Sequence, residues 1–229
     1  MKTNASFPSR HDGLLLAAWF SAVIGVFGPW LGQPAAALAW NAYDLSDILR
    51  QLPQLQTCAV TVNLQALRLP QVGLAVLLPL LLAQARPQWR WGAALLGAGL
   101  ALGVLPPYPQ LIGAWRAPGW RVPFWWAISA ALAAGVLAGC GPRLGAWRPW
   151  LILVWTLLTG IPAGVTFYRL LPALRELYAA PVHPGWGFWS CAGGLLALAG
   201  LSWLQALKKM TNEANDKWSG RFSVIAQCE

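Results

Sequence analysis

Charged side chains are scarce in this chain of 229 residues, of which only 10% are charged and only seven are acidic. A soluble globular domain carries about 25% charged residues, so most side chains here are expected to face lipid or one another. Histidine is limited to His11 and His183, and the four cysteines are dispersed without a CxxC pair. This scarcity argues against a ligated metal and a disulfide framework, so we expect no metal and no cofactor.

Apolar residues make up 57% of the chain and form six runs. A bilayer core needs roughly 20 apolar residues per helix. The runs cover residues 14–31, 72–85, 91–105, 123–140, 150–167 and 186–207. We predict an all-α polytopic membrane helix bundle of about six transmembrane helices, formed by residues 14–207. The polar ends, 1–13 and 208–229, are expected to be tails, the second poorly ordered or folded back on the surface.

Small residues recur at every fourth position of the run 123–140, at Ala127, Ala131, Gly135 and Gly139. This spacing forms one stripe on a helix, and such a stripe lets another membrane helix approach closely. Similar small-residue patterns elsewhere add four more expected packing positions, which are Ala18, Ala22, Gly97 and Gly194. Pro79 predicts a kink whose freed carbonyl is satisfied by neighbouring helices.

The longest connection, residues 32–70, contains a short amphipathic helix within the sequence AYDLSDILRQLP. Its apolar positions follow helical spacing and are Leu45, Ile48, Leu49 and Leu52, after which Pro53 ends the pattern. Asp44 is the predicted N-cap, with Asp47 three residues later. The helix is expected to cover one end of the bundle or to lie on the membrane surface.

Basic residues are distributed unequally between the two sides of this topology. The side with both termini holds ten: Lys2, Arg10, Arg86, Arg90, Arg143, Arg148, Lys208, Lys209, Lys217 and Arg221. The other side holds six: Arg50, Arg68, Arg116, Arg121, Arg169 and Arg175. The positive-inside rule then predicts a multi-pass plasma-membrane protein with both termini in the cytoplasm.

The net charge of +9 is explained by this bias and by contact with the headgroups of the lipid bilayer, so no nucleic-acid partner is expected. A secretory signal peptide cleaved near residues 37–39 is the alternative interpretation of the first run. That run is longer than a usual signal-peptide core of about 7–15 residues, which favours a retained helix.

No ionisable residue lies within the six runs, so we expect helices that pack without buried charge. Proton pumps, ion-coupled carriers and voltage sensors normally need such residues. The stretch GFWSCAGG around Ser190 resembles the serine motif of the intramembrane rhomboid proteases, but no later histidine can act as base. We therefore expect a non-catalytic accessory or scaffold subunit that contacts other membrane proteins, with a membrane enzyme as the third possibility.

The second possible function, uptake of a small molecule, is suggested by the topology. Six helices, cytoplasmic termini and a long first outer loop resemble the substrate-binding subunits of energy-coupling-factor vitamin importers. The resemblance implies uptake of a small molecule bound beneath residues 32–70, with Ala18 and Ala22 facing a partner. The outer face offers six candidate contacts for a ligand, an acidic partner or lipid headgroups: Asp44, Asp47, Arg116, Arg121, Arg169 and Arg175.

Overall fold

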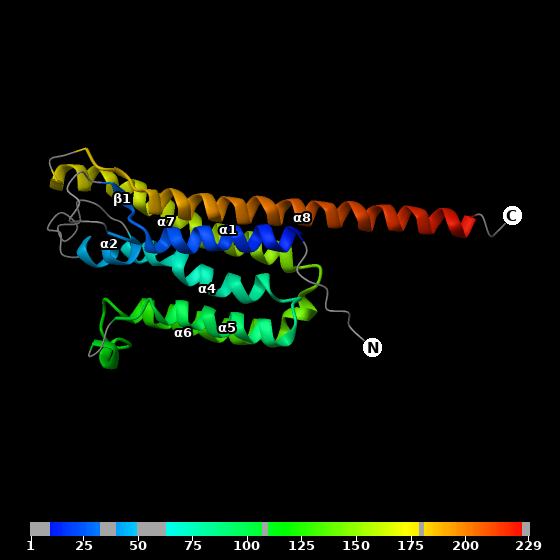
Figure 1. Cartoon of the computed structure of the whole chain (residues 1–229), viewed down its shortest axis with the longest axis horizontal. Coiled ribbons are helices and arrows are strands. Elements are labelled where there is room, and N and C mark those ends of the chain that lie inside the picture. The colour runs from blue at the N-terminus through cyan, green and yellow to red at the C-terminus, as the bar shows by residue number, and fades with distance from the viewer. Residues whose placement is uncertain (1–9, 33–39, 50–62, 107–109, 179–180, 226–229) are drawn as a thin grey trace.

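The computed structural model describes residues 10–32, 40–49, 63–106, 110–178 and 181–225. These residues are mostly helical, as the predicted all-α bundle requires, and the long helices lie alongside one another (Figure 1). The long helices are α1 (Arg10–Phe27), α4 (Leu69–Leu81), α5 (Pro87–Leu102), α6 (Arg121–Cys140), α7 (Arg148–Tyr178) and α8 (Trp186–Ile225).

Shorter elements connect the long helices. They are α2 (Ala42–Ile48) and the 3₁₀ helices η2 (Leu64–Arg68), η3 (Gln110–Gly113) and η4 (Gly141–Leu144). Two short strands, β1 (Leu31–Gly32) and β2 (His183–Pro184), pair in antiparallel fashion. This pairing ties the chain after α1 to the chain before α8, and it is an addition to the purely helical prediction.

Five described stretches are long and apolar enough to cross a bilayer: Arg10–Phe27, Leu64–Leu81, Arg121–Leu144, Arg148–Glu176 and Trp186–Asn212. The remaining long helix, α5, is shorter, with 16 residues. Large apolar side chains stand out from the bundle surface, among them Leu95 at 74% exposure and Leu196 at 71%. Extended apolar surface of this kind is unusual on a soluble monomer, so the helices are compatible with a membrane-embedded protein.

The helix α4 lies at the centre of the bundle. It packs against α1 and α7 on one side and against α5 and α6 on the other, while α8 packs against α1 and α7. Every residue from Pro70 to Leu81 is buried. Apart from Gln71 this stretch is apolar on all faces, and a helix with that pattern lies either inside a protein core or in a membrane. The packing partners show that α4 is enclosed by other helices of this chain.

Small residues bring the backbones of α1 and α8 into contact. A side-chain carbon at Gly194 would lie 2.5 Å from the backbone nitrogen of Ala22 and 2.6 Å from the carbonyl oxygen of Ala18. Beside them, the Ser190 hydroxyl donates to the carbonyl oxygen of Ser21 at 2.9 Å. Close backbone approach of this kind is how membrane helices gain van der Waals contact.

Two predicted helix ends are wrong. The helix α8 continues unbroken to Ile225, through the residues expected to be poorly ordered or folded back on the surface, and the end of the helix projects beyond the bundle (Figure 1). Residues 208–225 contain no proline and only one glycine, so the local sequence has little to end the helix. Likewise α7 continues past Phe167 to Tyr178, with Pro162 and Pro172 inside it.

Candidate functional site

Two arginines lie buried at opposite ends of α4. Arg68, the residue just before α4, is 1% exposed, and Arg148, the first residue of α7, is 7% exposed. The expectation of a bundle without buried charge is therefore wrong at these two positions. Burying a charge is costly unless it is paired and hydrogen-bonded. The groups that pair with each arginine consequently define the candidate site.

The guanidinium of Arg68 donates hydrogen bonds to groups from two other elements. Its Nε atom donates to Ser46 Oγ at 2.8 Å, and one terminal nitrogen donates to Asp47 Oδ1 at 2.6 Å. Both acceptors belong to α2. The second terminal nitrogen contacts the carbonyl oxygen of Val104, just after α5, at 3.4 Å. One side chain thus joins α2, α4 and the end of α5.

Two aromatic rings complete this group. The guanidinium carbon of Arg68 lies 4.5 Å from the ring centre of Tyr43 and 4.3 Å from that of Trp120. A desolvated cation–π contact contributes about 2 kcal/mol. Because Trp120 immediately precedes α6, the contact also fixes the start of that helix. We call these five residues the Arg68 cluster: Tyr43, Ser46, Asp47, Arg68 and Trp120.

The opposite end of α4 is held by Arg148. Its Nε atom donates to the carbonyl oxygen of Leu80 at 3.2 Å, and a terminal nitrogen donates to that of Leu81. The same terminal nitrogen donates to Asp12 Oδ1 of α1 at 2.9 Å. The last carbonyls of a helix lack intrahelical donors and carry partial negative charge. Arg148 therefore caps α4 while joining it to α1 and α7.

A contact between α1 and α8 also lies at this end of the bundle. His11 Nδ1 and the Gln205 side-chain nitrogen are 2.7 Å apart. His11 directly precedes Asp12, so two consecutive side chains near the start of α1 reach two different helices. We call Asp12, Arg148 and the two carbonyl groups of Leu80 and Leu81 the Arg148 cluster.

The middle of α4 is held by contacts to its backbone. The Trp19 indole of α1 donates to the carbonyl oxygen of Leu74 at 2.8 Å. Pro79 has no N–H group, so the carbonyl of Ala75 loses its usual donor four residues later. Gly97 of α5 lies directly against this carbonyl, where any side-chain carbon would overlap the oxygen. A neighbouring helix thus lies against the carbonyl freed by Pro79, whereas a hydrogen-bond donor to this carbonyl stays a prediction.

Both arginine clusters connect α4 to the helices around it. Each places one permanently charged guanidinium among groups from at least three elements of the fold. Removing Arg68 leaves the buried hydroxyl of Ser46 without this donor, and an unsatisfied buried polar group costs more free energy than its hydrogen bond contributes. The clusters thereby fix the position of α4 along its axis relative to the surrounding helices.

The predicted packing residues of α1, α5 and α8 lie at helix contacts. Ala18, Ala22 and Gly194 meet one another, and Gly97 meets α4. The resemblance to vitamin importers implied that Ala18 and Ala22 face a partner. In this structure both residues are buried against α8, so they do not form an open face for a partner.

Only part of the small-residue stripe predicted for α6 lies against other helices. Ala127 is fully buried, and Ala131 packs against the residues around Ala130. In contrast, a side-chain carbon at Gly135 or Gly139 would meet no atom within 4 Å. The buried positions of α6 are Pro123, Ala127, Ala130, Ala134 and Ala138.

The predicted acidic contacts belong to α2. Asn41, not Asp44, is the N-cap: its Oδ1 atom accepts the backbone N–H of Asp44 at 2.9 Å. The helix therefore begins earlier than predicted, and Asp44 lies in its first turn. Asp47 pairs with Arg68. Leu45 and Leu49 are buried as the amphipathic pattern requires, whereas residues 50–53 of that pattern lie outside the described residues.

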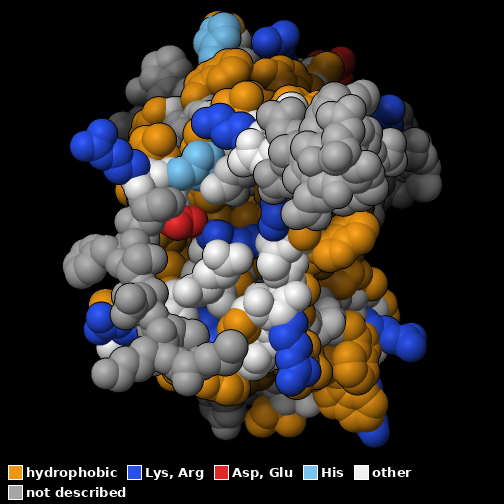
Figure 2. All heavy atoms as spheres, turned by 90° about the vertical axis from the view of Figure 1, so that its right-hand side faces the viewer, with side chains coloured by type: hydrophobic (Ala, Val, Ile, Leu, Met, Phe, Trp, Pro, Cys, Tyr) orange, Lys and Arg blue, Asp and Glu red, His pale blue; other side chains and the backbone are white. Residues whose placement is uncertain are grey.

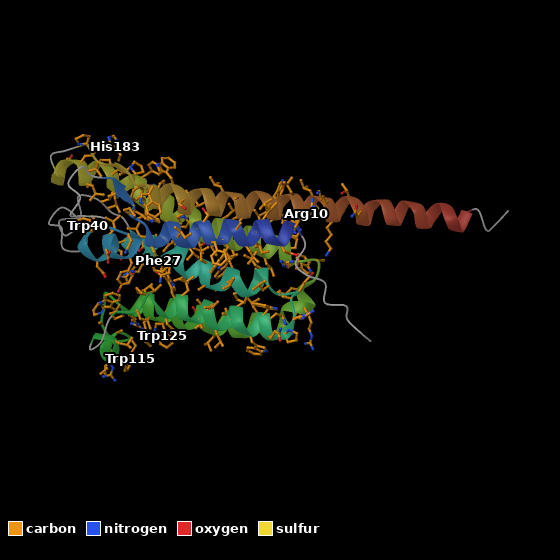
Figure 3. The ribbon with its side chains drawn as sticks, viewed as in Figure 1. Arg10, Phe27, Trp40, Trp115, Trp125 and His183 are labelled. Carbon is orange, nitrogen blue, oxygen red and sulfur yellow. The ribbon has the colours of Figure 1, made fainter. Side chains whose placement is uncertain are left out.

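The four predicted basic contacts are exposed. The guanidinium of Arg116 lies 4.0 Å from the ring centre of Trp115, and Arg175 Nε donates to the carbonyl oxygen of Val182 at 3.2 Å. Arg121 and Arg169 are the other two. In Figure 3 the labelled Trp115 lies toward the end of the bundle opposite the labelled Arg10.

Sequence reasoning assigned Arg68 and Arg148 to connecting loops and did not single them out. A signal was present for Arg68, which stands in the apolar stretch LQALRLPQ directly before the most apolar helix. Its partners are remote, since Asp47 and Trp120 are 21 and 52 residues away. For Arg148 the local sequence offers no comparable signal, because its partners are backbone carbonyls of another helix and Asp12, which is 136 residues away.

Among the described residues, no group of three or more His, Cys, Asp or Glu side chains is placed to hold a metal ion. Cys140 and Cys191 are free thiols, and Cys58 and Cys228 lie outside the described part of the chain. No protein-family model, curated protein or solved structure matches this sequence.

Proposed function

We propose that this protein is a non-catalytic scaffold subunit embedded in the plasma membrane, with both chain termini in the cytoplasm. The exposed leucines of α5, α6 and α8 support embedding, because hydrocarbon is a better environment for them than water. The excess of Lys and Arg on the side of the termini supports the orientation. The arginine clusters hold α4 at both of its ends, which supports a rigid bundle rather than a carrier that changes conformation.

The observation that carries the scaffold role is the length of α8. We call residues 208–225, which form the end of α8 and include the part that projects past the bundle, the α8 arm (Figure 1). The arm extends for about 27 Å at 1.5 Å per residue. Most of the stability of a helix in a protein comes from the packing of one of its faces, so a protein that packs along the arm would stabilise it. A membrane bundle with a projecting helix is suited to holding another subunit at the membrane surface.

Gentle extraction tests this proposal. We expect the full chain, purified through an N-terminal tag in a mild detergent, to emerge as an assembly heavier than one 24.7 kDa chain plus its detergent. Accompanying polypeptides would be identified by mass spectrometry. A lone chain under conditions that preserve other membrane complexes contradicts the scaffold role.

A matched pair of variants locates the contact on the arm. Thr211 is exposed near the base of the arm. Thr211→Pro interrupts the helix there, at about 3 kcal/mol, and should release the accompanying polypeptides. Thr211→Ala preserves the helix and should retain them. Equal retention by both variants would show that the arm does not hold the partner.

A further inference from the structure

A cavity of about 120 Å³ opens between the start of α7 and the point where α8 leaves the bundle. Six residues line it: Ala146, Trp147, Trp150, Ala206, Lys209 and Met210. The wall thus contains two indoles, a thioether, two methyl groups and one ammonium group. Among the residues whose side chains the structure describes, none that lines the cavity is acidic.

The aromatic wall is fixed on one side and open on the other. Trp150 packs edge-on against Trp203 of α8, with ring centres 5.6 Å apart. Trp147 is 70% exposed despite its size. Indoles at such a boundary have an apolar body and one polar N–H group, which suits the level where lipid headgroups meet hydrocarbon.

An apolar track continues from the cavity along α7. Its members are exposed and follow helical spacing, so they lie along one face: Trp147, Leu151, Val154, Leu158 and Ile161. From Trp147 to Ile161 the track runs for about 21 Å at 1.5 Å per residue. A flexible hydrocarbon chain lying on this track would cover side chains that the protein itself leaves uncovered.

The charges around the cavity favour an anion. Lys209 lines the cavity, and Lys208 is its exposed neighbour in sequence. Figure 2 looks onto this end of the bundle and shows basic side chains spread over it, with few acidic ones among them. The site therefore combines a single cation at the cavity with an apolar track leading away from it, which matches the shape and charge of an anionic phospholipid.

We propose that this cavity binds one anionic phospholipid of the cytoplasmic leaflet. Its phosphate contacts Lys209, its glycerol region lies against Trp147 and Trp150, and one acyl chain follows the track on α7. The inference rests on the proposed embedding in the membrane. It adds a defined lipid site at the base of the α8 arm, where bound lipid would brace the arm against the bundle.

Native mass spectrometry of the full chain in a mild detergent tests the site, with phosphatidylglycerol and phosphatidylcholine of identical acyl chains as probes. We expect phosphatidylglycerol to be retained preferentially. Lys209→Ala should weaken its binding about fivefold, the effect of one basic residue at an anionic surface. Lys208→Ala removes the same charge one residue away from the cavity lining and serves as the matched control, with little expected change.

A second variant tests the cavity itself. Ala146 is exposed at the cavity, so Ala146→Phe should fill the space without disturbing the core, and it should abolish preferential retention of phosphatidylglycerol. Equal losses in Lys208→Ala and Lys209→Ala would overturn the defined site in favour of diffuse attraction. Equal retention of the two lipids would overturn the assignment of an anionic occupant.

Alkaline carbonate extraction separates this inference from the proposed function. A chain that stays in the membrane pellet but shows no lipid preference overturns the lipid site alone. A chain released into the supernatant overturns the embedding, and the lipid site with it.

Discussion

The ion pair between Arg68 and Asp47 predicts that replacing Asp47 destabilises the protein more than replacing Arg68. The two side chains are only 2.6 Å apart, yet the Arg68 side chain is 0% exposed whereas that of Asp47 is 32% exposed. Replacing Asp47 by Ala leaves a buried guanidinium without its counter-charge. Replacing Arg68 by Met leaves a carboxylate that water can still reach. The two substitutions delete the same ion pair, but they leave partners in different environments.

The difference in stability between the two variants can be estimated from the environment of the charge that each one leaves behind. Removing one partner of a buried ion pair costs about 3–5 kcal/mol, because the other charge stays buried, and we expect this for Asp47→Ala. For Arg68→Met we expect about 2–3 kcal/mol. The hydrogen bonds and cation–π contacts of Arg68 that are lost would by themselves cost more than this. The substitution also removes the cost of burying a charge, and the methionine can recover part of the contact with Tyr43 and Trp120 through its sulfur.

The assay is reversible unfolding of the purified chain by SDS titration in mixed micelles. Arg116→Met is the matched control, since this exposed arginine also lies over an indole but forms no ion pair with a residue that the structure describes. It should change stability by less than about 1 kcal/mol. Equal losses for Arg68→Met and Asp47→Ala, or a larger loss for Arg68→Met, would refute the argument from burial. So would losses no larger than that of Arg116→Met.

Two further substitutions test how α4 is held. Gly97→Ala should lower the free energy of unfolding by about 1–3 kcal/mol in the same titration, because the new carbon overlaps the Ala75 carbonyl. Its control, Gly99→Ala, places a carbon in open space and should be neutral or slightly stabilising. Equal effects of the two would contradict the contact between α5 and α4. Arg148→Met should lower the free energy of unfolding by about 2–4 kcal/mol, because it leaves the end of α4 without its cap. The exposed Arg143→Met should lower it by less than about 0.5 kcal/mol, and similar values for both variants would contradict the capping role.

The sequence predicted the six long helices, because long apolar runs have no other way to satisfy their backbone in an apolar environment. The central position of α4 did not follow from its sequence, because a helix that is apolar all round can be surrounded by protein or can face lipid. Helix ends were less certain. In α8 the change from apolar to polar residues at Lys208 marks where the bundle ends, and the helix nonetheless continues.

Only the tertiary structure decided which face of each helix is buried. A helix such as α6 is apolar on every side, so no polar face indicates its rotation, and the spacing of small residues could not distinguish Ala134 from Gly135. The burial of Arg68 and Arg148 was likewise beyond local sequence. Their acceptors come from α2, from α1 and from the backbone of α4 itself, and these groups meet only when the helices pack.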